Sequence, residues 1–376
     1  MCYIIPGDSM KKIGIIAEYN PFHNGHLYQI NEIKKIFPDS LIIVILSGNF
    51  TQKGDISIIN KWDKTNIALN YVDLVIENPF CFCTESADIF AYSSISILKE
   101  LKVDYLVFGS ESNNIDILYK LANTQINNKE FDYKVKYYLD LGFNYPNSLA
   151  KALKELTSYE IKEPNDILGI TYIKEIINQK ADIIPHSIKR TNDYNSLELN
   201  DKIVSASAIR NGIKNNKNIN KYIPNYKINN PHFIDEYFTL LKYKILTTDD
   251  LSIYQSVDEG IEFRIKKYIN ESNNLEELID KCKTKRYTYN RIKRMFLHIL
   301  CNFTKKEAKN RKISYIRVLG FNSKGKNYLN KIKKDVNLPI LTKYNDSLYI
   351  EKRVTDIYNL ITNGIEEHKN KIIKKD

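Results

Sequence analysis

Along the first 190 residues, short runs of consecutive apolar residues alternate with segments whose apolar residues recur every three or four positions. The runs predict strands buried on both faces, and the recurring spacing predicts helices. Strands are predicted at 13–17, 41–46, 73–76, 103–108 and 181–188, and helices at 27–36, 61–71, 85–101, 133–141, 147–156 and 164–177. This alternation predicts an α/β fold with a doubly wound parallel sheet.

Beyond Pro224 the pattern changes to helical spacing. Helices are predicted at 233–246, 261–270, 275–281, 290–300 and 354–369. A chain of 376 residues is long enough for two domains, each with its own core. We therefore expect an N-terminal extension at 1–11, an α/β domain at 12–230 and a mainly helical domain at 231–376.

Several classes of protein are excluded by composition. There is no run of about 18 apolar residues, so we expect no membrane-spanning helix and no membrane partner. The first ten residues do not resemble a signal peptide, and five cysteines are few for this length, which favours a cytoplasmic protein with reduced thiols. Cys81 and Cys83 lie in an apolar stretch typical of buried cysteines, so no metal site is predicted. The sequence assigns no oligomeric state.

Charge is distributed unevenly along the chain. The segment 281–334 holds 18 Lys or Arg residues and one acid, a net +17, whereas the whole chain carries +11 and the remainder therefore −6. A basic region beside a mildly acidic body is typical of proteins that bind polyanions. Within it, 281–294 interleaves cations with Tyr287 and Tyr289, and 319–325 reads as a glycine-bearing basic turn. Cations suit phosphates and tyrosine faces suit unstacked bases, as in recognition of an RNA loop.

The candidate chemistry begins where the first predicted strand ends. Asn20-Pro21 is a turn signal, and His23-Asn24-Gly25-His26 follows as a helical pattern starts. Helix N-termini at the carboxyl ends of parallel strands offer free amide groups to phosphate, so two imidazoles there would face an anion.

Later loops add further candidates for a phosphate or nucleotide site. The polar loop 47–55 follows the second strand and includes Lys53 and Asp55. Gly109 directly follows the fourth strand, where a missing Cβ allows close approach of a base or ribose. The fifth strand delivers Arg190, and 205–210 places serines at a helix start before an arginine, which suits a triphosphate as well as a plain N-cap.

These groups favour attack at the α-phosphate of ATP. The chain offers imidazoles, amides, Lys and Arg, but no Walker loop with its Gly-Lys-Ser/Thr sequence. An adenylate-forming reaction fits this inventory better than γ-phosphate transfer, with positive groups stabilising the charge that develops on phosphate oxygens.

The motifs together resemble a known family. Residues 13–28 resemble the signature of the His-x-Gly-His nucleotidyltransferase superfamily, which has a Rossmann-like domain. Ala-Glu-Tyr-Asn-Pro-Phe-His-Asn-Gly-His-Leu, Ser-Gly-Asn-Phe-Thr-Gln-Lys-Gly, Phe-Gly-Ser-Glu, Pro-Asn-Asp-Ile-Leu-Gly, Ile-Lys-Arg and the basic Lys-Thr-Lys-Arg-Tyr-Thr segment resemble the bacterial tRNA(Met) cytidine acetate ligase family. Lys53 stands where that family more usually has arginine, and the 205–210 segment is looser than the superfamily's serine-rich motif.

The resemblance implies a ligase that uses ATP, together with Mg²⁺, and acetate to make acetyladenylate and releases pyrophosphate. The acetyl group would pass to N4 of the wobble cytidine, position 34, of elongator tRNA(Met). His23 and His26 would stabilise the α-phosphate transition state. The implied ATP-binding residues are Ile16, Ala17, Glu18, Tyr19, Asn20, Pro21, Phe22, His23, Asn24, Gly25, His26, Leu27, Tyr28, Gln29, Gly109, Asn165 and Arg190.

The basic segment supplies the candidate tRNA contacts, which are Lys281, Lys283, Lys285, Arg286, Tyr287, Arg291, Lys293 and Arg294. Two alternatives stay open at this point. One is a nucleotidyltransferase that adenylylates a small phosphorylated cofactor precursor, which leaves the basic region without a task. The other is a tRNA-binding protein without catalysis that binds ATP only as a regulatory ligand.

Overall fold

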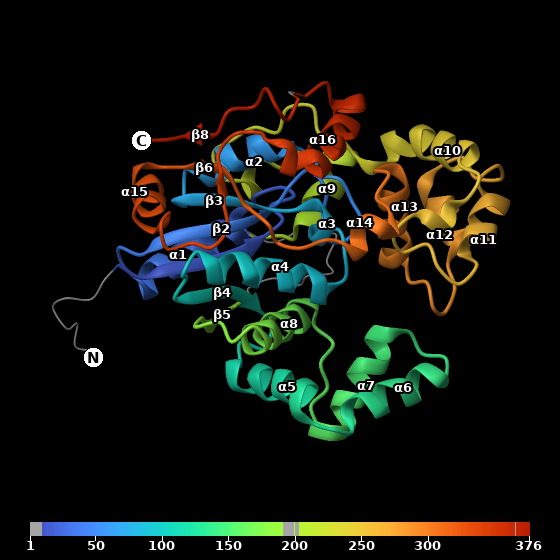
Figure 1. Ribbon diagram of the computed structural model, residues 1–376, viewed down its shortest axis with the longest axis horizontal. Helices are drawn as coiled ribbons and strands as arrows, with labels where there is room; N and C mark the ends of the chain where they lie inside the picture. Colours follow the sequence, from blue (N-terminus) through green and yellow to red (C-terminus); the bar gives the residue numbers. More distant parts are fainter. Residues whose placement is uncertain (1–9, 191–198, 200–202, 365) are drawn as a thin grey trace.

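The computed structural model describes residues 10–190, 199, 203–364 and 366–376. Its centre is a sheet in the order β5-β4-β1-β2-β3-β6-β7, with β8 beside β6 (Figure 1). The first five strands pair in parallel, as predicted. They are β1 Lys12–Ala17, β2 Leu41–Ser47, β3 Leu74–Asn78, β4 Tyr105–Ser110 and β5 Ile184–Lys189.

Helices cover both faces of this sheet because its strands are apolar on both sides. In β2, Leu41, Ile43 and Ile45 enter one core, whereas Ile42, Val44 and Leu46 enter the other. This alternation follows from the two-residue period of a strand. The first core is closed mainly by α4 Ala87–Glu100, α5 Ile115–Asn127 and α8 Pro164–Asn178, and the second by α1 Asn24–Ile36 and α2 Lys61–Ala68. α6 Phe131–Asp140 and α7 Tyr145–Thr157 form a hairpin between α5 and α8.

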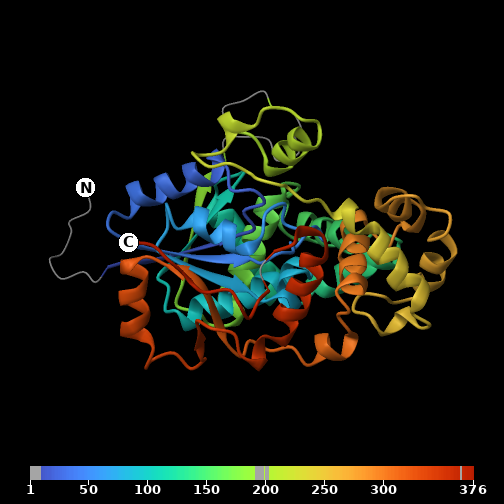
Figure 2. The same ribbon diagram turned by 90° about the horizontal axis from the view of Figure 1, so that it is seen from above.

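After α9 Ala206–Lys214, the chain forms a separate hydrophobic core that is made mainly by helices. It is formed by α10 Phe238–Thr247, α11 Ile261–Tyr268, α12 Leu275–Cys282 and α13 Tyr289–Leu300. Figure 2 shows these helices as a group beyond one end of the sheet. Their core also takes in Phe50, Phe80 and Phe82 from the α/β part, so the two parts are packed together. Phe80 and Phe82 lie in α3 Phe80–Cys83 with Cys81 and Cys83, which are buried as predicted.

The last part of the chain returns to the sheet, which the sequence patterns did not indicate. β6 Ile316–Phe321 pairs antiparallel with β3 and places Phe321 opposite Leu74. The predicted turn at 319–325 is therefore wrong in part, since its first residues end a strand. The other elements are α14 Lys305–Lys309, α15 Ser323–Ile332, β7 Ile340–Leu341, α16 Tyr349–Thr362 and β8 Ile373–Lys374.

Two expectations from sequence need comment at this level. The helix predicted at 354–369 begins earlier and ends at Thr362, because Asn363 adopts a left-handed conformation with φ 51°. The predicted extension at 1–11 falls mostly outside the described residues, and the division at residue 230 stays a prediction. Within the described ranges, no helix has the length and apolarity needed to cross a bilayer.

Candidate active site

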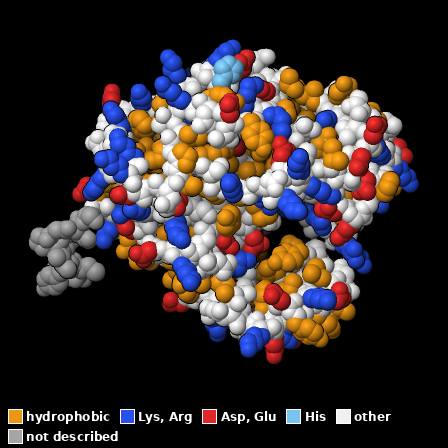
Figure 3. Space-filling view, viewed as in Figure 1, with side chains coloured by type: hydrophobic (Ala, Val, Ile, Leu, Met, Phe, Trp, Pro, Cys, Tyr) orange, Lys and Arg blue, Asp and Glu red, His pale blue; other side chains and the backbone are white. Residues whose placement is uncertain are grey.

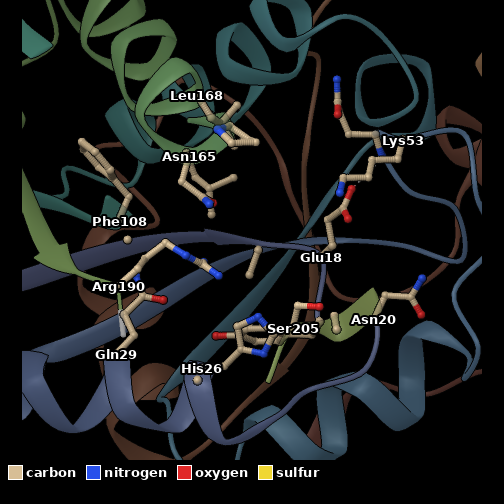
Figure 4. Close-up of a pocket in the computed structure, with 18 of the residues that line it drawn as sticks. Glu18, Asn20, His26, Gln29, Lys53, Phe108, Asn165, Leu168, Arg190 and Ser205 are labelled. Carbon is tan, nitrogen blue, oxygen red and sulfur yellow. Dashed lines mark hydrogen bonds between the residues drawn. The ribbon is translucent and has the colours of Figure 1, made fainter. Parts of the chain in front are cut away.

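A cavity of about 580 Å³ opens at the carboxyl ends of β1, β4 and β5 (Figure 4). The N-terminal turns of α1, α8 and α9 converge on it. This is the edge at which parallel sheets bind ligands, and three helix N-termini make it favourable for negative charge. Predicted residues in its wall are Ile16, Ala17, Glu18, Tyr19, Asn20, His23, Gly25, His26, Tyr28, Gln29, Gly109, Asn165 and Arg190.

Four residues of the predicted nucleotide stretch do not line the cavity, namely Pro21, Phe22, Asn24 and Leu27. Phe22 is fully buried and packs edge-on against Tyr19. Asn24 instead donates from Nδ2 to the Lys221 carbonyl at 2.8 Å. These positions support the site from behind, because the chain turns and begins a helix here and cannot present every side chain to one side.

His23 and His26 form a pair at the start of α1. His23 is the N-cap, and its Nδ1 accepts a hydrogen bond from the Gly25 amide at 3.0 Å. The His23 amide in turn donates to Nδ1 of His26 at 3.2 Å. The two rings lie 3.8 Å apart between centroids. Each imidazole is thus oriented by a backbone amide, in the reciprocal arrangement of a capping box.

Both imidazoles are neutral in this environment. Burial lowers the pKa of His23 to about 3, with further lowering by the charges of Arg190 and Arg210. Burial, His23 and Arg190 hold the pKa of His26 well below its usual value. Because each Nδ1 accepts an amide proton, the ring proton is assigned to Nε2. Two neutral Nε2–H donors are therefore available in the wall of the cavity.

Gly25 is required by this pair of rings. A Cβ built on it would lie 2.7 Å from Cε1 and 3.0 Å from Nδ1 of His23. A side chain at this position would displace the His23 ring or break its bond to the amide. The glycine between the two histidines thus fixes the direction of the first one.

Arg190 enters the cavity from the end of β5 and crosses Gly109. A Cβ on Gly109 would come within 3.3 Å of the Arg190 Cγ, so this glycine makes room for the arginine side chain. The Arg190 Nε lies 3.5 Å from Oε1 of Glu111, which also accepts a hydrogen bond from Nδ2 of Asn165. Asn165 and Arg190 are therefore brought together on one carboxylate. Figure 4 shows both side chains in the wall of the cavity.

Asp166 organises the loop that carries Glu111. Its carboxylate accepts hydrogen bonds from the Ser110 hydroxyl at 2.5 Å and from the Glu111 and Ser112 amides at 3.1 and 3.0 Å. The first turn of α8 and the end of β4 are thus locked to each other. The sequence motif Pro-Asn-Asp places Pro164 and Asn165 in the cavity wall and Asp166 beneath it.

Arg210 reaches the cavity from α9. Its Nη1 donates to the Asn20 carbonyl at 2.6 Å and its Nη2 to the Ser207 hydroxyl at 3.1 Å. Ser205 is the N-cap of α9, where its hydroxyl accepts from the Ala208 amide at 3.0 Å. All three residues line the cavity. Both interpretations of 205–210 therefore apply, because an ordinary N-cap here also faces the candidate phosphate site.

Two important polar residues gave no signal in the sequence. The Gln52 amide donates to Oε1 of Glu18 at 2.7 Å, which joins the loop 47–55 to the end of β1. Lys64 is fully buried, and its Nζ donates to the carbonyls of Glu18, Ser47 and Gly48 at 2.9, 2.7 and 2.8 Å. Lys64 thus ties the ends of two strands together. Only the folded chain reveals these roles, because the partners, a carboxylate for Gln52 and carbonyl groups for Lys64, lie far away in sequence.

Of the two charged residues predicted in the loop 47–55, Lys53 lines the cavity and Asp55 does not. Asp55 pairs with Lys293 of α13, with 2.8 Å between Oδ2 and Nζ. Burial alone would raise the pKa of Asp55, but the charges of Lys293 and Arg210 bring it below its usual value. Asp55 is therefore a contact between the α/β part and the helical part. Asn290, one turn earlier, lines the cavity from the helical side.

The predicted tRNA-binding residues separate into two groups. Lys283, Lys285 and Arg286 are exposed in the loop between α12 and α13. Figure 3 shows basic side chains along this side of the helical part, above a hollow that separates it from α6 and α7. These three residues are placed as a surface for RNA requires.

The other predicted tRNA contacts are buried or partly buried and bind other parts of the protein. Tyr287 is 4 % exposed, donates to the Asp258 carbonyl at 2.5 Å and is covered by Arg291, whose guanidinium carbon lies 4.1 Å from the ring centroid. Its predicted role in stacking on a base is therefore wrong for this conformation. Lys293 and Arg294 face the loop 47–55, and Lys281 donates to the Glu271 carbonyl at 2.5 Å.

Comparison with known proteins places the chain in a family. A model of the HIGH Nucleotidyl Transferase family matches residues 10–372. The tRNA(Met) cytidine acetate ligases of Caldicellulosiruptor saccharolyticus and Clostridium novyi are each 40 % identical to the chain, over 93 % and 95 % of it and 94 % and 96 % of their own lengths.

Solved structures agree with the sequence comparison. Thermotoga maritima TmcAL in its apo form superposes with a TM-score of 0.89 at 27 % identity, covering 97 % of this chain and 99 % of that one. The same protein bound with alpha-thio ATP superposes with a TM-score of 0.86, with the same identity and coverage. From these matches and the geometry of the cavity, the chain belongs to the tRNA(Met) cytidine acetate ligase family of HIGH nucleotidyl transferases.

Proposed function

We propose that the protein is an ATP-dependent ligase that activates acetate as acetyladenylate and transfers the acetyl group to N4 of the wobble cytidine of elongator tRNA(Met). The product would be N4-acetylcytidine at position 34. The observation that carries this proposal is the paired His23 and His26 at a helix N-terminus, in a chain that belongs to a family whose curated members carry this name. The T. maritima relative bound with alpha-thio ATP supports ATP as the substrate.

In the first step an acetate oxygen attacks the α-phosphorus of ATP, and the bond to the bridging oxygen of pyrophosphate breaks. Negative charge grows on the phosphate oxygens in the transition state. The Nε2–H groups of His23 and His26 and the guanidinium groups of Arg190 and Arg210 are the cavity's donors for that charge. Neutral imidazoles can donate without first taking up a proton, so they are ready at neutral pH.

Mg²⁺ would accompany ATP mainly as a ligand of the triphosphate. Among the residues that the structure describes, no group of three or more His, Cys, Asp or Glu side chains could hold a metal ion by itself. Mg²⁺ commonly keeps several waters and binds substrate phosphates with one or two carboxylates. Glu18 lies in the cavity wall, but its Oε1 already accepts from Gln52, so the described part of the chain offers no dedicated metal cage.

In the second step N4 of the cytidine attacks the acetyl carbonyl carbon. The carbon–oxygen bond to AMP breaks, AMP leaves, and N4 loses a proton. The cytidine must leave its stack to reach the adenylate. Lys283, Lys285 and Arg286 lie on the loop before α13, and Asn290 in the first turn of α13 lines the cavity. A phosphate backbone held by this loop would therefore pass close to the cavity.

The purified protein tests this proposal with ATP, radiolabelled acetate and an elongator tRNA(Met) transcript. We expect pyrophosphate release that depends on acetate, and labelled N4-acetylcytidine that depends on the tRNA. Pyrophosphate release without acetate, but with a small phosphorylated compound, would instead support the cofactor-precursor alternative. Binding of tRNA with no pyrophosphate release under any condition would support the non-catalytic alternative.

A further inference from the structure

A second cavity, of about 540 Å³, lies outside the candidate active site. It is enclosed by α3, α14 and the start of α16, with the segment between α14 and β6 on its rim. Figure 1 shows these helices together at the junction of the sheet and the helical part. Its volume is within the range of ordinary ligand sites, about 300–1,000 Å³. None of the groups named above for adenylate formation lines it.

The wall of this cavity is cationic. Lys306, Arg311, Lys312 and Arg353 line it, together with the acid Glu307. Glu307 is engaged by Nη1 of Arg353 at 2.9 Å, and Arg311 pairs with Glu85 at 2.6 Å. Lys306 and Lys312 are exposed. The charge of these two lysines is therefore left over after the acids nearby have been paired, and it favours an anionic ligand.

Arg353 adds a more specific feature. Its Nε and Nη2 are buried and have no hydrogen-bond partner among the described residues. These two atoms form the side-on edge of the guanidinium, which matches two oxygens of a phosphate. Because these two donors are buried, the Arg353 side chain must shift for a phosphate in the cavity to reach them, and such binding would supply the hydrogen bonds that they lack.

A tyrosine pair gives the cavity an aromatic side. Tyr315 and Tyr349 both line it, and the Tyr349 side chain is 52 % exposed at the start of α16. Cations beside an accessible tyrosine face suit a nucleotide, whose phosphate and base need different partners. The combination distinguishes this cavity from a simple phosphate site.

We propose that this second cavity binds one nucleotide of the RNA substrate, with the phosphate on Lys306, Lys312 and Arg353 and the base against Tyr349. The inference rests on the proposed function for the identity of the RNA. Three of the cationic wall residues, Lys306, Arg311 and Lys312, belong to the basic segment 281–334 in which the sequence predicts RNA contacts. The cavity thus binds the RNA at a nucleotide other than the reacting cytidine.

Charge reversal tests the phosphate contact. We expect Lys312→Glu and Lys306→Glu each to weaken binding of an elongator tRNA(Met) transcript about tenfold near 0.1 M salt and to lower the salt slope by about one unit. The matched control is Lys309→Glu, because Lys309 is exposed on α14, as Lys306 is, but does not line the cavity. Equal losses in Lys309→Glu and in the two cavity variants would overturn the proposal.

Substitution of Tyr349 tests the base contact. Tyr349→Phe keeps the aromatic face and should bind tRNA like the unaltered protein, whereas Tyr349→Leu should bind about tenfold more weakly. Identical affinities of the two variants would contradict the assignment of Tyr349 to a base. All variants should retain acetate-dependent pyrophosphate release without tRNA, and this readout also excludes misfolding.

Inorganic phosphate and pyrophosphate distinguish a site for free phosphate from a site for RNA. Each ion is titrated by thermal stabilisation into the unaltered protein and into Lys312→Glu. Stabilisation that requires Lys312, with tRNA binding unchanged in the variant, would mean a site for free phosphate and would overturn the RNA assignment. Failure of the proposed function would appear differently, as absent acetate-dependent pyrophosphate release in the unaltered protein.

Discussion

The carboxylate of Asp55 and the ammonium group of Lys293 meet at 2.8 Å across the junction between the loop 47–55 and α13. The same loop carries Gly54 with φ 78°, and a Cβ there would lie 2.4 Å from the Arg294 amide nitrogen. The helical part is thus seated directly on the loop that also supplies Gln52 and Lys53 to the cavity. One contact therefore joins the helical part to the loop that lines the candidate active site.

Substitution of Gly54 by Ala should weaken the packing of α13 on the loop 47–55. The left-handed backbone and the close approach of α13 both disfavour a side chain, so we expect a loss of more than about 1 kcal/mol in the free energy of unfolding. Urea unfolding measures this loss. The control is Gly142→Ala, where φ is 88° but nothing lies within 4 Å of the added Cβ. If the two variants lose equal stability, backbone strain alone is responsible and the contact with α13 contributes nothing.

Removal of either partner of the Asp55–Lys293 pair should lower the free energy of unfolding. Each of Asp55→Asn and Lys293→Met leaves a partly buried charge without its partner, and we expect about 2 kcal/mol for either. The double variant should lose less than the sum of the two. A double-mutant cycle by urea unfolding measures the difference, and strictly additive losses would show that the two side chains do not interact in solution.

His26→Ala should slow acetyladenylate formation by about a hundredfold to a thousandfold, because one donor to the developing charge is removed. Binding of tRNA should stay nearly unchanged. Acetate-dependent pyrophosphate release and tRNA binding are measured on the same preparation. His232→Ala is the control, since that side chain pairs with Glu236 at 3.0 Å outside the cavity wall. A parallel loss of both activities in His26→Ala would mean that the imidazole is structural.

The neutral histidines should also destabilise the fold in acid. Because the folded pKa of His23 is about 3 and that of His26 is well below 6.5, the unfolded chain binds protons first as the pH falls. Their contribution is complete above pH ~6.5 and is lost towards pH ~3, by up to about 1.4 kcal/mol per pH unit for each histidine. Urea unfolding between pH 7 and 4.5 measures the slope. His23→Gln should reduce it, and an unchanged slope would assign acid sensitivity to other groups.

Neutralising the exposed basic residues of the loop 283–286 should weaken tRNA binding and leave the rate of acetyladenylate formation unchanged. Lys283→Ala, Lys285→Ala and Arg286→Ala together should lower the salt slope by about three units, since each phosphate contact contributes about one. The matched control is the triple variant of Lys331, Lys333 and Lys334, which are exposed at or just beyond α15. Figure 1 places α15 at the opposite end of the sheet from α12 and α13. An equal change in both triple variants would show that net charge alone attracts the RNA.

Much of the candidate site could be predicted from the sequence because its main residues lie close together along the chain. His23, Gly25 and His26 act through a single turn of chain, and their spacing was sufficient to predict their place at a helix start. Strands buried on both faces were equally readable, because their apolar runs need no knowledge of neighbours. Arg190 was placed correctly for the same reason, since it directly follows a strand.

Residues whose partners lie far away in sequence could not be predicted in this way. Lys64 looks like an ordinary helix lysine until the carbonyls of Glu18 and Ser47 are seen around it. Tyr287 has the sequence context of an RNA contact, yet packing of α11–α13 buries it. The turn predicted at 319–325 overlaps the end of β6, because the residues of a single strand cannot show which distant sheet edge the strand will join.

Strand β6 has a consequence for how the chain matures. It covers the edge of β3, yet it is synthesised more than 230 residues later. During translation the earlier strands emerge from the ribosome with that edge unpaired, and an unpaired strand edge readily accepts a foreign strand. The sheet therefore cannot be completed until β6 has been made, and the edge of β3 stays open to other strands until then.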